Sequence, residues 1–94
     1  MTLARGDSVW IPCDVTHSVF PDERNVSIAC EAGRWAGYVD VRHLRDAILD
    51  GRTAIRATVV EASRDEISAR LPGQTTRHQY LRLRGTDRSR IQEI

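Results

Sequence analysis

Arginine and aromatic side chains gather near the end of this chain. Four residues spaced two apart fall on one face of a predicted strand over residues 78–84, and they are His78, Tyr80, Arg82 and Arg84. Guanidinium groups neutralise phosphates, and bases stack on aromatic and guanidinium planes. This face therefore predicts nucleic-acid binding, and Arg77, Arg88 and Arg90 would extend it. The alternative interpretation is an ordinary solvated strand face, because the chain has no lysine and arginine must fill its basic positions.

Two large aromatic residues form a second candidate surface. Trp10 and Tyr38 each fall opposite the apolar face of a predicted strand. If both are exposed, they would line a groove for a peptide or a second subunit, because aromatic residues dominate interface hot spots. The alternative is that both are partly buried in a small barrel, under the loop around Phe20.

Two thiols and two imidazoles have the chemistry of zinc ligands. They are Cys13, His17, Cys30 and His43, and their spacing lacks the two close pairs typical of structural zinc sites. We therefore predict no metal, and we interpret both cysteines as small core side chains. The nucleophile-elbow, phosphate-loop and zinc-protease motifs are also missing, so we expect no catalytic residue and no cofactor.

The length and composition of the chain indicate one domain. The chain has 94 residues, of which 40% are hydrophobic and 29% charged, a composition typical of a folded globular chain. No apolar run approaches a membrane span and no signal region opens the chain, so we expect a cytoplasmic location. Two cysteines are too few for a disulfide framework. The exclusive use of arginine indicates GC-rich coding DNA, which favours a bacterial source.

Charge is unevenly distributed along the chain. Residues 70–94 hold six arginines against two acidic residues, whereas residues 1–69 hold eight arginines against eleven acidic residues. A basic C-terminal part on an acidic body points to an anionic partner.

Apolar residues alternate with polar ones in most of the sequence, which is typical of strands. The predicted strands cover residues 8–15, 26–30, 35–41, 53–62, 67–71 and 78–84. Pro12 predicts an edge position or a bulge in the first of them. Val41, Leu44 and Ile48 have helical spacing, which predicts one or two helical turns within residues 40–50, ended by Gly51.

The middle of the chain carries a family pattern. Trp35-Ala36-Gly37-Tyr38-Val39, followed by a short turn and Leu44, resembles the end of a bacterial SH3-like domain. The opening Gly6-Asp7-Ser8-Val9-Trp10 is similar to the first strand of such barrels. The resemblance covers about the first half of the chain and implies a small β-barrel. It does not extend to the residues with which eukaryotic SH3 domains hold proline-rich peptides.

We therefore predict an all-β fold: an SH3-like small barrel with an additional β-hairpin and one short helical turn. Residues 1–85 would form this single domain, and residues 86–94 a basic, frayed C-terminal tail. The first functional prediction is a non-enzymatic binding or assembly module that contacts a protein partner or a second copy through Trp10 and Tyr38. The alternative is nucleic-acid binding by the basic C-terminal strand, and a small enzyme or ligand-binding barrel comes third.

Overall fold

The structure is a computed structural model that describes residues 3–31, 33–49, 52–72, 74–75 and 80–94. These residues form two β-sheets, one 3₁₀ turn and one short helix. Sheet A contains β1 (Ser8–Pro12), β5 (Leu44–Leu49), β6 (Arg52–Ala62), β7 (Glu66–Arg70), β9 (Tyr80–Arg84) and β10 (Gln92–Glu93). Sheet B contains β2 (Asp14–His17), β3 (Glu23–Cys30), β4 (Gly33–Asp40) and β8 (Gln74–Thr75). The 3₁₀ turn η1 is Val41–His43 and the helix α1 is Thr86–Ser89.

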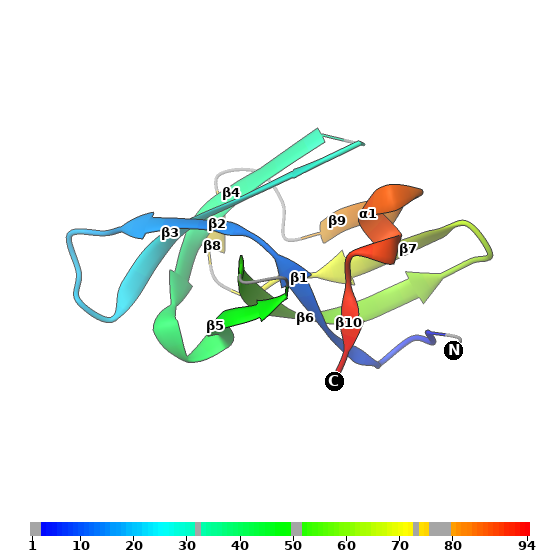
Figure 1. Cartoon of the computed structure of the whole chain (residues 1–94), viewed down its shortest axis with the longest axis horizontal. Helices are drawn as coiled ribbons and strands as arrows, with labels where there is room; N and C mark the ends of the chain where they lie inside the picture. The colour runs from blue at the N-terminus through cyan, green and yellow to red at the C-terminus, as the bar shows by residue number, and fades with distance from the viewer. Residues whose placement is uncertain (1–2, 32, 50–51, 73, 76–79) are drawn as a thin grey trace.

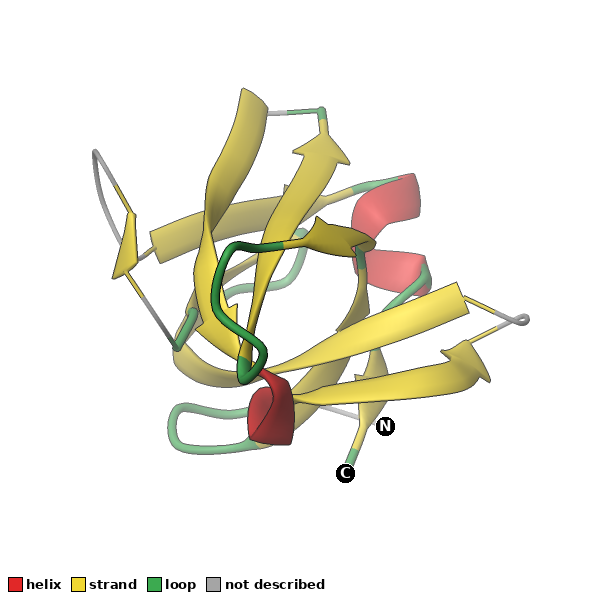
Figure 2. Cartoon of the chain, turned by 90° about the vertical axis from the view of Figure 1, so that its left-hand side faces the viewer, coloured by secondary structure: helices red, strands yellow, loops and turns green. Residues whose placement is uncertain are grey.

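Every strand pair in the described residues is antiparallel. Sheet A has the order β10–β1–β6–β7–β9, with β5 also paired to β6, and sheet B has the order β2–β3–β4–β8 (Figures 1 and 2). The chain crosses between the sheets at Cys13 and at η1, and it crosses twice more because β8 of sheet B comes between β7 and β9 of sheet A. The predicted all-β class is confirmed, and in the described residues the strands pair as two sheets without closing into one ring.

The core lies between the inner faces of the two sheets. It is built from the alternating apolar residues that the sequence places on single strand faces: Val9, Ile11, Val26, Ile28, Trp35, Val39, Ile55, Val59, Ile67, Leu81 and Leu83 among others. Trp35 and Val39 are almost completely buried, and Leu44 packs against the same cluster. Burial of these side chains supplies most of the driving force for folding, since each contributes about 1.5–3 kcal/mol.

The predicted additional hairpin is confirmed. The strands β6 and β7 pair from Thr58 opposite Arg70 to Ala62 opposite Ile67, with a register shift between Val59 and Glu61. The connection is closed by the Ser63 amide, which donates to the Glu66 carbonyl at 2.8 Å. This hairpin extends from the body of the molecule in Figure 1.

Pro12 lies at the end of β1, beyond the part of this strand that pairs with β10. The Ser8 carbonyl accepts a hydrogen bond from the Ile94 amide, so the even residues of β1 direct their backbone groups toward β10. β10 reaches only Val9 and Trp10. The missing N–H of Pro12 therefore costs no ladder bond, which agrees with the predicted edge position.

The one short helical turn predicted within residues 40–50 is present as η1, and the rest of this range is a strand. The η1 turn is capped by the Asp40 side chain, which accepts from the Arg42 amide at 2.9 Å. Leu44 then takes extended dihedral angles and β5 follows, so the second of the one or two expected turns does not form. The physical reason is that β5 finds a partner in β6, with Leu44 opposite Ile55 and Arg45 opposite Ala54. Gly51 lies outside the described residues.

The prediction of a frayed tail over residues 86–94 is corrected by three contacts. Residues 92–93 form β10 and pair with β1, and Ile91 packs against the core. The Asp87 carboxylate accepts from the Glu31 amide at 2.7 Å, which ties α1 to the end of β3. These contacts join the last nine residues to the domain predicted for residues 1–85. No helix in the described ranges has the length and apolar character needed to cross a membrane.

The two isoleucines of this segment test its docking. Ile91 is partly buried against the core, whereas the side chain of Ile94 is 54% exposed. We expect Ile91→Ala to lower the free energy of unfolding by about 1–2 kcal/mol and Ile94→Ala to change it by less than about 0.5 kcal/mol, as measured by urea unfolding. Equal, negligible effects of both changes would show that the segment is frayed.

Candidate functional site

The alternation of β9 separates its apolar and basic side chains. Leu81 and Leu83 point into the core, while Tyr80, Arg82 and Arg84 are exposed on the outer face of sheet A. The predicted one-sided arrangement of these three residues is therefore present in the structure. His78, the fourth residue of the predicted set, lies outside the described residues, and so does Arg77.

The neighbouring strand β7 adds one more arginine to this face. In the register of the two strands, Arg70 lies opposite Tyr80, Ser68 opposite Arg82, and Glu66 opposite Arg84. Side chains directly opposite each other on an antiparallel pair stand about 5 Å apart. We name the four exposed residues Arg70, Tyr80, Arg82 and Arg84 the arginine face.

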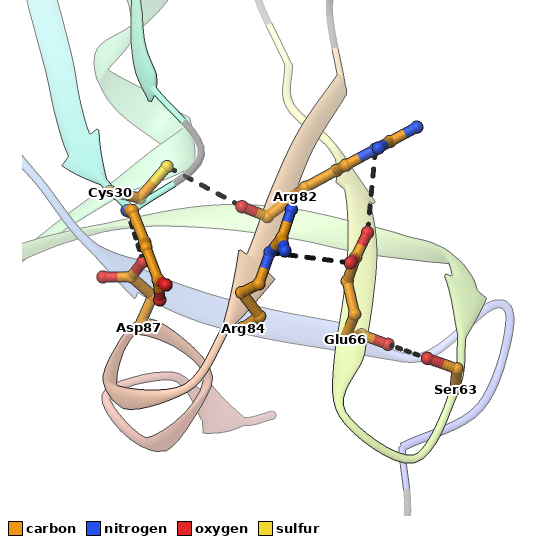
Figure 3. Close-up of polar contacts among 7 residues, drawn as sticks. Cys30, Ser63, Glu66, Arg82, Arg84 and Asp87 are labelled. Carbon is orange, nitrogen blue, oxygen red and sulfur yellow. Dashed lines mark hydrogen bonds and ion pairs between the residues drawn. The ribbon is translucent and has the colours of Figure 1, made fainter.

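One carboxylate serves both arginines of β9. Glu66 Oε1 lies 3.6 Å from Arg82 Nε, and Glu66 Oε2 lies 3.7 Å from Arg84 Nε (Figure 3). The Arg82 and Arg84 side chains remain 68% and 48% exposed, so these ion pairs are weak and leave a positive surplus. Two guanidinium groups that share one acid can accept a further anion without losing much pairing energy.

The basic character continues across the outer face of sheet A. Arg56 of β6 and Arg45 of β5 lie on the same side as Arg70, by the register of these strands with β1 and β7. The strands of sheet A carry six arginines against four acidic residues, whereas those of sheet B carry two arginines against three acidic residues. The excess of positive charge therefore belongs to one sheet.

Trp10 does not offer an exposed contact surface, so the exposure on which its expected role as a partner-binding residue depends is not found. Its side chain is 8% exposed and lies outside the main core cluster. The Arg45 guanidinium covers the ring, with Cζ 5.1 Å from the ring centroid, in a cation–π contact. The loop around Phe20 was expected to cover Trp10, but the contact described for the ring is with Arg45. Phe20 is itself 60% exposed.

Tyr38 lies on the other sheet and, unlike Trp10, has an exposed side chain. It lies on the outer side of β4, opposite Asn25 of β3, and it is 53% exposed. The prediction that both aromatic residues share a groove therefore does not fit the fold, since Trp10 belongs to sheet A and Tyr38 to sheet B. Tyr38 alone remains an exposed aromatic residue of that pair.

The two arginines of the C-terminal segment make contacts of their own. Arg88 donates to the Ser63 carbonyl at 2.9 Å and also to the Arg64 carbonyl, so its guanidinium fastens α1 to the β6–β7 loop. Arg90 lines a separate cleft of about 130 Å³ together with Asp14, Arg52 and Asp87. The structure thus keeps Tyr80, Arg82 and Arg84 on one strand face, while Arg88 is held by backbone carbonyls and Arg90 lines a cleft with acidic residues.

The cysteines and histidines do not converge. In the described ranges no three potential metal ligands lie close enough to share an ion. The Cys13 thiol is buried and faces the Thr53 carbonyl at 3.6 Å, and the Cys30 thiol faces the Gly33 carbonyl at 3.0 Å and the Arg82 carbonyl at 3.7 Å. Neither of these two sulfur atoms forms a disulfide bond. Their contacts are those of structural residues, and Cys30 links the end of β3 to β9 (Figure 3).

Sequence reasoning overlooked Arg56 and Arg70 as site residues. Arg70 does alternate outward between Ala69 and Leu71, and Arg56 does so between Ile55 and Ala57. The alternation of these arginines with apolar residues can be seen in the sequence, but only strand pairing shows that they share a face with Tyr80.

Comparisons with known protein families, with curated proteins and with solved structures find no match for this chain. The resemblance to bacterial SH3-like domains stays a prediction based on the stretch from Trp35 to Leu44 and on the opening strand.

The buried thiol gives a pH-dependent prediction. Burial raises the pKa of Cys13 from 9.0 to about 12, more than the nearby Arg52 guanidinium lowers it. At pH 8 its thiolate is then about a thousandfold scarcer than that of an ordinary cysteine, so we expect a thiol reagent to label Cys13 only after unfolding. A Cys30→Ala variant leaves Cys13 as the only thiol for this measurement.

The same shift affects stability at alkaline pH. The folded state retains the Cys13 proton between pH 9 and about 12, while the unfolded state releases it, so stability decreases as pH rises through this window. Cys13→Ala should show a smaller decrease in urea unfolding over that range. Rapid labelling of Cys13 in the folded protein at pH 8 would contradict both expectations.

Proposed function

We propose that this protein binds single-stranded nucleic acid on the arginine face. The observation that carries the proposal is the exposed alternation of Tyr80, Arg82 and Arg84 on β9, with Arg70 directly opposite Tyr80. Exposed aromatic rings stack on unpaired bases, and guanidinium groups contact the phosphates that link them. An arginine-rich strand face around one tyrosine supports both contacts within a few ångströms.

The shape of this surface favours a single strand over a duplex. A duplex hides the flat faces of its bases, and its major groove accepts a protruding helix or a two-stranded ribbon. The outer face of β7 and β9 is a sheet surface, and the one described helix, α1, has only four residues. Alternate side chains along a strand stand about 6.6 Å apart, so an extended backbone can follow Arg82 and Arg84.

Protein binding through Trp10 and Tyr38 has less support. Arg45 covers Trp10, and the two aromatic residues belong to different sheets. Tyr38 remains as an exposed residue among acidic neighbours, since Asp40 shares its strand face and Glu23 lies opposite Asp40. Self-association through Tyr38 is therefore the alternative, and substitution of Tyr38 and of Tyr80 distinguishes it from nucleic-acid binding.

A cytoplasmic location is part of this proposal. Nucleic acid is the partner that the proposed function requires, and neither Cys13 nor Cys30 forms a disulfide bond, as expected in a reducing compartment.

The two tyrosines form a matched pair for the first test. Tyr80 is 52% exposed on sheet A and Tyr38 is 53% exposed on sheet B. Loss of one stacked base costs about 1–3 kcal/mol, so we expect Tyr80→Ala to weaken binding of a labelled oligonucleotide of about 15 nucleotides by roughly 5- to 150-fold. Tyr38→Ala should leave this affinity unchanged, as measured by fluorescence anisotropy at fixed salt.

The opposite pattern would overturn the proposal. If the wild-type protein fails to bind the oligonucleotide, and Tyr38→Ala converts a dimer to a monomer in sedimentation equilibrium, the exposed aromatic surface serves a protein contact.

Glu66 offers a second test in which a variant should gain affinity. Glu66→Gln removes the single carboxylate between Arg82 and Arg84, and the hairpin turn persists because it uses the Glu66 backbone carbonyl. We expect oligonucleotide binding to tighten roughly two- to fivefold at low salt. The matched control Glu23→Gln changes the net charge equally on sheet B and should have a smaller effect. Equal gains from both changes would indicate attraction by net charge alone, without a local site.

A further inference from the structure

One edge of β6 is incompletely paired in the described structure. β5 pairs with the first part of this edge, up to Leu44 opposite Ile55, and β7 pairs with the last part, from Arg70 opposite Thr58. Neither strand has a residue in register with Arg56 or Ala57 on this side. The outer face of sheet A therefore has a gap between the end of η1 and the end of β7.

The backbone groups of Arg56 lie on this side of β6. On the other edge of β6, the Val59 amide donates to the Asp7 carbonyl and the Val59 carbonyl accepts from the Gly6 amide, both at 2.8 Å. Backbone groups alternate along a strand, so the odd residues of β6 face β1 and the even residues face β5, the gap and β7. In the register that pairs Leu44 with Ile55, the Arg56 amide faces the His43 carbonyl, so the gap begins beyond this position.

Basic side chains surround the same gap. It forms a cleft of about 280 Å³ whose polar lining is His43, Arg56, Thr58 and Arg70, with Leu71 and Pro72 as an apolar wall. None of the described residues that line it is acidic. Across the described ranges, the ion pairs of other arginines involve Asp14, Asp40 and Glu66, and none reaches Arg56 or Arg70.

We propose that this cleft binds one phosphate group of the nucleic-acid strand, an inference that rests on the function proposed above. Two guanidinium forks, of Arg56 and Arg70, provide paired N–H donors to phosphate oxygens, and the Thr58 hydroxyl adds a single donor. Arg70 belongs to both parts of the surface, because it lines the cleft and lies opposite Tyr80. A strand whose base stacks on Tyr80 can therefore place an adjacent phosphate in the cleft.

Arg56→Gln in the full chain tests the subsite, with Arg34→Gln on sheet B as the matched control. Each phosphate contact contributes about 0.7 to the slope of log affinity against log salt for single strands. We expect Arg56→Gln to reduce this slope by about 0.7 and to weaken oligonucleotide binding roughly 5- to 20-fold, with circular dichroism verifying the fold. Arg34→Gln should change neither quantity appreciably. An unchanged slope and affinity for Arg56→Gln would overturn the subsite.

A titration of the wild-type protein with inorganic phosphate separates the two proposals. We expect saturable amide chemical-shift changes at Arg56 and Thr58, together with imidazole changes at His43, and their loss in Arg56→Gln. If phosphate produces these changes but the oligonucleotide does not bind, the subsite stands and the proposed function fails. If the oligonucleotide binds wild type and Arg56→Gln equally and phosphate shifts none of these signals, the proposed function stands and the subsite fails.

Discussion

The structure depends on the two-residue alternation of β6. Its odd residues Ile55, Ala57 and Val59 are buried in the core, and its even residues Arg56 and Thr58 lie on the outer face. The same alternation divides its backbone, so that β1 occupies one edge and β5 and β7 share the other. A one-residue slip of this strand would expose the core residues and bury a guanidinium group, which makes the register strongly determined. The core, the basic outer face and the cleft all follow from this single register.

Much of the fold could be predicted from the sequence because alternation is local. Leu81 and Leu83 identify the inner side of β9, and Tyr80 and Arg82 the outer side, without knowledge of any partner strand. The helical spacing of residues 41–48 predicted the turn η1 but could not show where it ends, because one turn of 3₁₀ helix and a following strand can place two apolar residues at the same interval. There, pairing with β6 outweighs local preference. A basic tail can likewise dock when a short strand finds an open edge, as β10 does on β1.

The candidate site could be predicted only in part, because its residues meet through long-range pairing. Arg70 and Tyr80 are ten positions apart and face each other only once β7 and β9 are in register. The cover of Trp10 is a similar case, since Arg45 approaches the ring only after β1 and β5 have both paired with β6. Composition indicated that arginine fills the basic positions, but it could not show that the surplus collects on one sheet.

The position of Pro12 has a consequence for the behaviour of the chain at high concentration. The outer edge of β1 is a row of backbone groups on which a strand from another molecule could assemble. The two residues of β10 occupy the row at Val9 and Trp10, and the next position that faces this way is a proline without an N–H group. An incoming strand would find the first part of the edge taken and the next donor missing. The outer edge of β1 is thereby protected from pairing with strands of other molecules.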